Sequence, residues 1–163
     1  MCAWILSIFR KSFNSFISMK ISLLRFIKLN TNKKRTLFIW YLCAYYRLQM
    51  LLIPAKKLEK NWGEKGKESP EVDPIRWHYR YCYQISRDVN RIADHTPWES
   101  KCLVRALTAR YFLHRQGIVT TMYLGVGRDE EGKMVAHSWL RCGEVYVTGG
   151  NGEKYATVAK FCK

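Results

Sequence analysis

The stretch from Thr96 to Gly117 reads TPWESKCLVRALTARYFLHRQG, and its pattern predicts a helix that ends at a glycine. The next stretch, residues 119–148, reads VTTMYLGVGRDEEGKMVAHSWLRCGEVYVT and is rich in β-branched and aromatic residues, as strands are. The expected strands are Val119 to Val126, Met134 to Arg141, Val145 to Thr148 and Thr157 to Phe161. One helix followed by an antiparallel meander is an α+β arrangement.

The start of this helix can be placed in two ways. Thr96 with Glu99 three residues later forms a capping box with Pro97 at the first helical position, but Ser100 could equally be the cap. With Ser100 as the cap, Cys102 lies in the first turn, where free N–H groups and the helix dipole stabilise a thiolate. With Thr96 as the cap, Cys102 lies nearly two turns in and gains less.

Length and composition predict one globular domain with an added segment. The chain has 163 residues, of which 48% are hydrophobic, enough for a packed core. The expected organisation is a variable N-terminal extension (1–18), a basic and apolar helical docking segment (19–60), a Gly-, Pro- and charge-rich linker (61–74) and a main domain (75–163). The main domain opens with a helix from Ile75 to Ala93, which has three- and four-residue apolar spacing.

The positive charge is concentrated at the N-terminus. Residues 1–60 carry 12 Lys and Arg against one acid, Glu59, whereas residues 61–163 carry 16 against 12. The first part therefore suits an acidic surface, either a partner protein or anionic lipid, or is a solvated basic face. Its apolar stretch, Leu37 to Ile53, is short for a membrane span and contains Arg47, so we expect a helix packed on a partner, on a membrane surface or on its own domain. No nucleic-acid-binding module is recognisable, so no nucleic-acid partner is expected.

Six cysteines lie far apart, without a CxxC pair or a convincing export signal. This pattern indicates a reduced, cytoplasmic compartment, with peripheral attachment at the inner face of the membrane as an option. Paired ligands at short spacing are missing, so we expect no metal site and no cofactor.

Cys102 and His137 are the candidates for nucleophilic chemistry. A thiol becomes a useful nucleophile when a neighbouring His or a helix N-terminus favours its ionised form. Trp139 follows His137 by two positions and so shares its strand face, where it could shield the imidazole from water. Trp98 and Ser100, just before Cys102, are further candidates for lining a cleft, although each Trp is more often plain core.

Three segments carry a resemblance to a known family: Trp98 to Leu103, Met122 to Val126, and Ala136 to Gly143 with its continuation to Gly150. Together they resemble the leader peptidase of lasso-peptide biosynthesis, the B protein, in its split form, the stand-alone protease half. The resemblance implies a transglutaminase-like, papain-type core, with a catalytic helix packed on an antiparallel sheet and N-terminal helices before it. It also implies that Cys102 is the nucleophile and His137 the general base.

The resemblance further implies the reaction and the partners. The substrate would be a lasso precursor peptide, delivered by a small leader-binding recognition protein, and an asparagine-synthetase-like, ATP-dependent lasso cyclase would then close the ring. The two alternatives are an acyl transferase of the same type and a non-catalytic adaptor that only binds the peptide.

One residue of the family pattern is missing. The family usually has an Asp about a dozen residues after the His to orient the imidazole, and position 149 is Gly here. Thr148, Asn151 or a backbone carbonyl could orient His137 instead, or Cys102 and His137 could act as a dyad.

Overall fold

A computed structural model describes residues 32–163 of the chain. The chain divides into two compact units, Met1–Phe38 and Ile39–Lys163. The predicted extension, residues 1–18, and residues 19–31 of the predicted docking segment lie outside the described residues. In the first unit the described residues begin helix α2 (Lys33–Leu52), which continues into the second unit. Among residues 32–163, the sheet and the other helices belong to the second unit.

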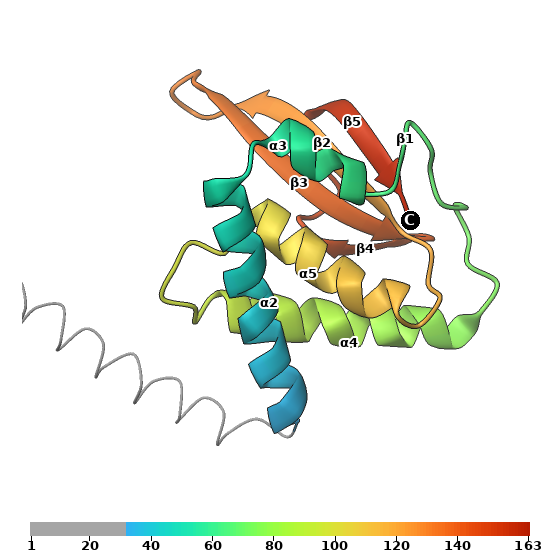
Figure 1. Cartoon of the computed structure of the whole chain (residues 1–163). Helices are drawn as coiled ribbons and strands as arrows, with labels where there is room; N and C mark the ends of the chain where they lie inside the picture. The colour runs from blue at the N-terminus through green and yellow to red at the C-terminus, as the bar shows by residue number, and fades with distance from the viewer. Residues whose placement is uncertain (1–31) are drawn as a thin grey trace, which may run out of the picture. The chain divides into compact units, whose positions relative to one another are not determined.

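An antiparallel sheet of five strands forms the centre of the second unit (Figure 1). Its strands are β1 (Glu64–Lys65), β2 (Thr121–Arg128), β3 (Met134–Cys142), β4 (Val145–Thr148) and β5 (Ala156–Cys162). The order across the sheet is β1-β5-β2-β3-β4, so β5 returns to pair with β2 on the side away from β3. The predicted α+β class is confirmed, and β2, β3 and β4 form the predicted antiparallel meander, whereas the last strand, β5, pairs with β2 and not with β4.

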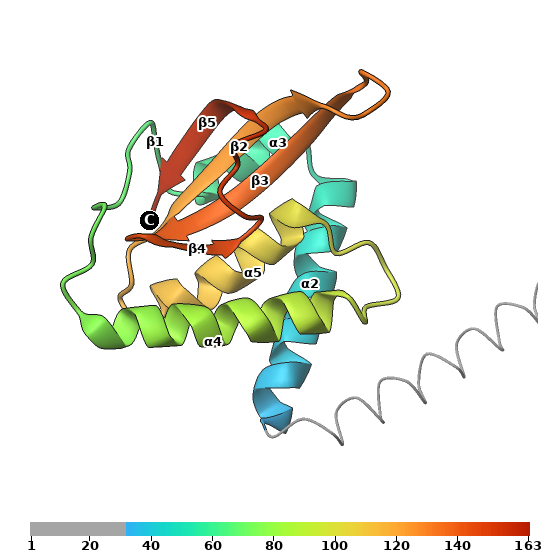
Figure 2. The same cartoon turned by 180° about the vertical axis from the view of Figure 1, so that it is seen from behind.

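Helices α4 (Arg76–Ala93) and α5 (Cys102–His114) lie side by side and pack against β3 and β4 (Figure 2). One face of α4 is buried, at the three- and four-residue spacing that the sequence shows: His78, Cys82, Ile85, Val89 and Ile92. The predicted helix from Ile75 to Ala93 is confirmed. Central apolar side chains of the sheet, such as Met122 and Leu140, are fully buried.

The apolar stretch that begins at Leu37 forms most of α2. In the second unit, Ile39, Leu42 and Cys43 are buried, and the Cys43 thiol lies 3.7 Å from the Thr108 hydroxyl of α5. This side of α2 therefore packs on its own domain, while Leu48 and Leu51 are exposed. None of the helices in residues 32–163 has the length and hydropathy that a membrane crossing requires.

The predicted linker, residues 61–74, takes part in the packing of the second unit. It contains β1, which pairs with β5, and Trp62, which is buried against Phe161 with ring centroids 5.5 Å apart. Ser69 is buried and its backbone N–H donates to the Thr121 hydroxyl at 2.7 Å. Between Leu52 and β1, the chain forms a short helix α3 (Ala55–Leu58) and a 3-10 turn, Glu59–Asn61.

Candidate active site

Cys102 is the first residue of α5, and its side chain is partly exposed. The residue before it, Lys101, has extended backbone angles and makes no side-chain capping hydrogen bond. The first N–H groups of a helix have no partners within the helix, and they stabilise negative charge together with the helix dipole. A thiolate at Cys102 is therefore in a favourable position. The alternative start with Thr96 as cap is wrong, and so is Ser100 as cap, although the first-turn placement of Cys102 is confirmed.

The loop before Cys102 is held by its own hydroxyl groups. The Thr96 and Ser100 hydroxyls lie 2.8 Å apart, and the Ser100 carbonyl accepts a hydrogen bond from Arg105 Nε at 2.8 Å. Ser100 is only 5% exposed, so this hydroxyl pair is a packed part of the structure. These contacts fix the chain just before the helix and thereby the direction from which Cys102 enters it.

Trp98 lies in the same loop and packs edge-to-face on Trp40 of α2, with ring centroids 4.4 Å apart and an interplanar angle of 67°. The Trp98 ring is partly exposed, while its Nε1 is buried without a hydrogen-bond acceptor among the described residues. Its role in lining a cleft stays a prediction.

His137 lies in β3, opposite Gly125 of β2, and its Nε2 is 2.7 Å from the backbone carbonyl oxygen of Gly149. A carbonyl oxygen only accepts hydrogen bonds, so Nε2 carries the proton. In a neutral imidazole Nδ1 is then the free acceptor. The structure thus gives His137 the tautomer in which Nδ1 can take a proton.

Two aromatic rings pack against the imidazole of His137. The His137 ring stacks on Tyr155 with centroids 4.5 Å apart, and on Trp139 at 6.1 Å. Trp139 itself is 4% exposed and stacks on Tyr123 at 5.3 Å. Trp139 and His137 share one strand face, as the sequence predicts from their spacing.

The segment between β4 and β5 brings Gly149 and Tyr155 to His137. Gly149 has a positive φ of 78°, and a side chain there would run into the Ser138 carbonyl oxygen and the Trp139 backbone. A side chain at Gly152 would likewise run into the Trp139 ring. Glycine is needed at both positions, because the segment runs against the strand that carries His137.

Thr148 and Asn151, the two side chains predicted to orient the imidazole, make other contacts. The Thr148 hydroxyl is buried with no hydrogen-bond partner among the described residues. The Asn151 side-chain amide donates to the Glu153 carboxylate. Of the three groups that the sequence allowed, the backbone carbonyl, that of Gly149, is the one hydrogen-bonded to His137.

Within residues 32–163, Cys102 and His137 share no hydrogen bond. They lie on α5 and β3, two elements that pack against each other. Catalytic hydrogen bonds are often long before substrate binds, so this geometry leaves the pair available as candidates. The same described residues contain no group of three His, Cys, Asp or Glu side chains that could hold a metal ion.

The structure contains a pair of buried thiols that the sequence did not predict. Cys82 of α4 and Cys142 at the end of β3 are both fully buried and hydrogen-bonded to each other. This hydrogen bond lowers the pKa of Cys142 and raises the pKa of Cys82. Cys142 has a lowered pKa, but its 0% exposure keeps it from a peptide substrate.

The sequence pattern of the transglutaminase-like superfamily matches residues 41–160, most of the chain. The chain belongs to the transglutaminase-like superfamily. No curated protein and no solved structure matches it. Transglutaminase-like domains are usually cysteine-dependent enzymes, and in this one a free, partly exposed cysteine opens the helix that packs on the sheet.

The tight fit at Gly149 gives a prediction for this transglutaminase-like domain. Gly149→Asp would introduce the carboxylate that the sequence analysis expected near His137, yet we expect it to lower the free energy of unfolding by about 3 kcal/mol or more. The reason is that the new Cβ adds a backbone collision to the cost of the positive φ. Urea denaturation followed by circular dichroism measures the change.

Gly150 provides a matched control for this substitution. It also has a positive φ, 69°, but no atom lies within 4 Å of an added Cβ. Gly150→Asp should therefore cost only about 1 kcal/mol, the cost of the backbone conformation. Equal losses in the two variants would contradict the close approach of Gly149 to Ser138.

Proposed function

We propose that this chain is a cysteine peptidase that removes the leader peptide from a lasso precursor. The observation that carries the proposal is the position of Cys102 in the first turn of the helix that packs on the sheet of a transglutaminase-like domain. The sequence segments around Cys102 and His137 add the resemblance to lasso leader peptidases.

The proposed reaction has two stages. The Cys102 thiol gives its proton to Nδ1 of His137, and the resulting thiolate attacks the carbonyl carbon of the scissile peptide bond. The imidazolium returns that proton to the leaving amine, and the leader remains bound to Cys102 as a thioester. Water, deprotonated by His137, then hydrolyses the thioester and frees the thiol.

The Gly149 carbonyl has a positioning role in this proposal. It accepts a hydrogen bond from the Nε2–H of His137, and it is a dipole at the place where lasso leader peptidases usually have a carboxylate. A dipole stabilises the imidazolium less than a full charge does, so we expect a lower rate than a carboxylate would give. Trp98, Ser100 and Trp139 are proposed to line the peptide cleft around the two residues.

The proposal includes partners and a location. A separate leader-binding protein would deliver the precursor in the cytoplasm, and an ATP-dependent synthetase would close the ring afterwards. The basic segment, residues 19–60, is proposed to dock on one of these proteins or on the inner face of the membrane. In its described part, exposed apolar side chains such as Tyr41, Leu48 and Leu51 support a docking role.

A cleavage assay tests the function. The purified chain is incubated with a lasso precursor and its leader-binding protein, and mass spectrometry follows the products. We expect two peptides whose masses add up to the precursor plus one water. A leader joined to an added primary amine would favour the acyl transferase, and an intact precursor bound to the chain would favour the adaptor.

A further inference from the structure

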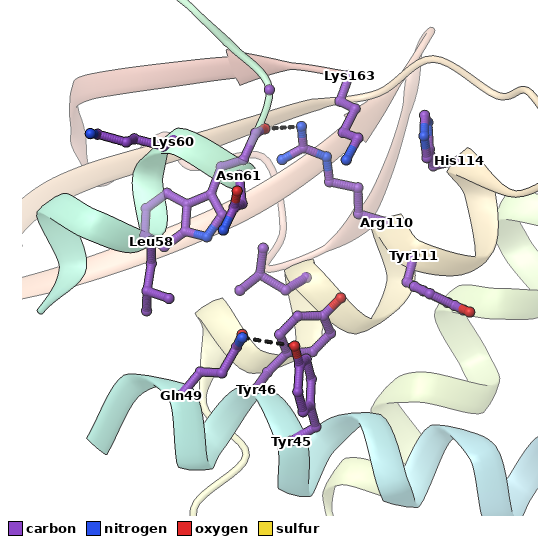
Figure 3. A pocket seen from close by; sticks show the side chains of 13 residues that line it. Tyr45, Tyr46, Gln49, Leu58, Lys60, Asn61, Arg110, Tyr111, His114 and Lys163 are labelled. Atoms are coloured by element: carbon purple, nitrogen blue, oxygen red, sulfur yellow. Dashed lines mark hydrogen bonds between the residues drawn. The ribbon is translucent and has the colours of Figure 1, made fainter. Parts of the chain in front are cut away.

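A cavity in the second unit is separate from the candidate active site (Figure 3). It has a volume of about 530 Å³ and lies among α2, the segment 58–63, the C-terminal part of α5 and Lys163. Arg110 of α5 is one of its lining residues and stands eight residues after Cys102, about 12 Å along the helix. The cavity is therefore open to a ligand independently of the proposed peptidase reaction.

Arg110 is a buried cation with unused hydrogen-bond donors. Its side chain is only 4% exposed, and its Nη2 donates to the backbone carbonyl of Trp62. Its Nε and Nη1 are buried and have no acceptor among the described residues. A buried N–H group without an acceptor is costly, and a carboxylate is the strongest acceptor that a guanidinium meets in proteins.

The charged side chains that line the cavity are all basic. Lys60 and Lys163 line it together with Arg110, and none of its lining residues is acidic. Burial lowers the pKa of Arg110 to about 10, which still leaves the guanidinium charged at neutral pH. Residues 1–31 contain no Asp or Glu, so that segment has no acidic side chain to pair with Arg110. The cavity therefore suits an anion from outside the chain.

Aromatic side chains line the same cavity. Tyr45 and Tyr46 come from α2, Tyr111 from α5, and Trp62 from the segment before β1 (Figure 3). Burial raises the pKa of Tyr46 to about 12, so its hydroxyl stays protonated and can donate a hydrogen bond. A flat apolar group next to the anion would pack on these rings.

We propose that this cavity binds a carboxylate carried on an aromatic or other apolar group, with Arg110 as the anchor of the carboxylate. The carboxylate completes the hydrogen bonds of the guanidinium, and Lys60 and Lys163 attract it from the rim. The same chemistry is present in a free aromatic acid and in a peptide with a Glu beside a Phe. Both kinds of ligand are therefore included in the test.

Binding to the full chain can be followed in ¹H–¹⁵N NMR spectra, through the Trp62 indole and the backbone amides around the cavity. The probes are phenylacetate, its neutral counterpart phenylacetamide, and N-acetyl-Glu-Phe-amide with its Gln counterpart. We expect saturable shifts with the acids and affinities about tenfold lower with the neutral counterparts, because a charged hydrogen bond is lost. Tighter binding of the peptide would assign the site to peptides, and tighter binding of phenylacetate to free acids.

Variants complete the experiment. Arg110→Gln should remove the preference for the acid over the amide, and Lys163→Gln should weaken acid binding about threefold. Tyr46→Phe changes the cavity without changing its charges. If Arg110→Gln does not fold, Tyr46→Phe and Lys163→Gln are the variants that test the proposal. Arg87→Gln, on the exposed side of α4, is the matched control and should bind like the wild type. Absence of saturable shifts, equal binding of acid and amide by the wild type, or equal effects of Lys163→Gln and Arg87→Gln would overturn the proposal.

Discussion

Replacing Cys102 with alanine is expected to abolish leader cleavage while the domain stays folded. Removing the nucleophile of a cysteine or serine protease lowers kcat by about 10⁴- to 10⁶-fold, because no other group can form the covalent intermediate. The thiol lies at the N-terminal end of α5 and is partly exposed, so its loss leaves the core unchanged. Cleavage is measured by mass spectrometry, and folding by the circular dichroism spectrum and the urea midpoint.

Two other cysteines make the matched controls. Cys142 is the thiol whose pKa is lowered, by its hydrogen bond with Cys82, so a chemical argument alone would choose it. It is fully buried, however, and Cys142→Ala should lower stability but retain cleavage at permissive temperature. Cys162→Ala, at the end of β5, should change neither. Cleavage that survives in Cys102→Ala and disappears in Cys142→Ala would overturn the assignment of the nucleophile.

The order of the sheet strands could be predicted only in part. β4 has the predicted bounds, Val145–Thr148, because both of its ends are marked by turn residues. The return of β5 to β2 could not be predicted, because local patterns carry no information on which strand will be the neighbour. β1 was missed for a related reason: two residues, Glu64 and Lys65, are too short a run to show an alternating pattern.

The candidate site, like the sheet, could be predicted only in part. Local signals gave the placement of Cys102 in the first turn of a helix as one of two alternatives, and both proposed caps, Thr96 and Ser100, differ from the observed one, Lys101. The partner of His137 did not follow from the sequence, because every residue has a carbonyl group and only the folded segment between β4 and β5 brings that of Gly149 to the imidazole. In the sequence, Gly149 stood out because the resemblance implies an Asp at about this position. Its positive φ and its contact with Ser138 show that the backbone itself requires glycine there.

The unused donors of Arg110 are also invisible in the sequence. An arginine on a helix is usually exposed, and the spacing of the apolar residues in α5 does not indicate that Arg110 is buried. Its burial results from the segment around Trp62, which the sequence assigned to a linker and which closes over α5. The cavity was missed because the sequence carries no sign that this segment packs on α5.

His137→Gln is expected to lower kcat/KM for leader cleavage by on the order of 10³-fold without unfolding the domain. The glutamine amide can still donate a hydrogen bond to the Gly149 carbonyl, so the contact with the β4–β5 segment is retained. It has no nitrogen that can accept a proton, so the Cys102 thiol loses its base. Stability from urea denaturation should change by less than about 1 kcal/mol, since the ring contacts with Tyr155 and Trp139 are only partly lost.

A second readout separates a base from a residue that only supports the fold. If His137 takes the proton of Cys102, the thiol should react with iodoacetamide several-fold more slowly in His137→Gln than in the wild type, because the base that accepts its proton is lost. His95→Gln, at the end of α4, is the control and should change neither alkylation nor cleavage. Wild-type alkylation and cleavage rates in His137→Gln would overturn the assignment of His137 as the base. A slower alkylation together with lost cleavage would show that the two side chains meet in solution, although the structure holds them on separate elements without a direct hydrogen bond.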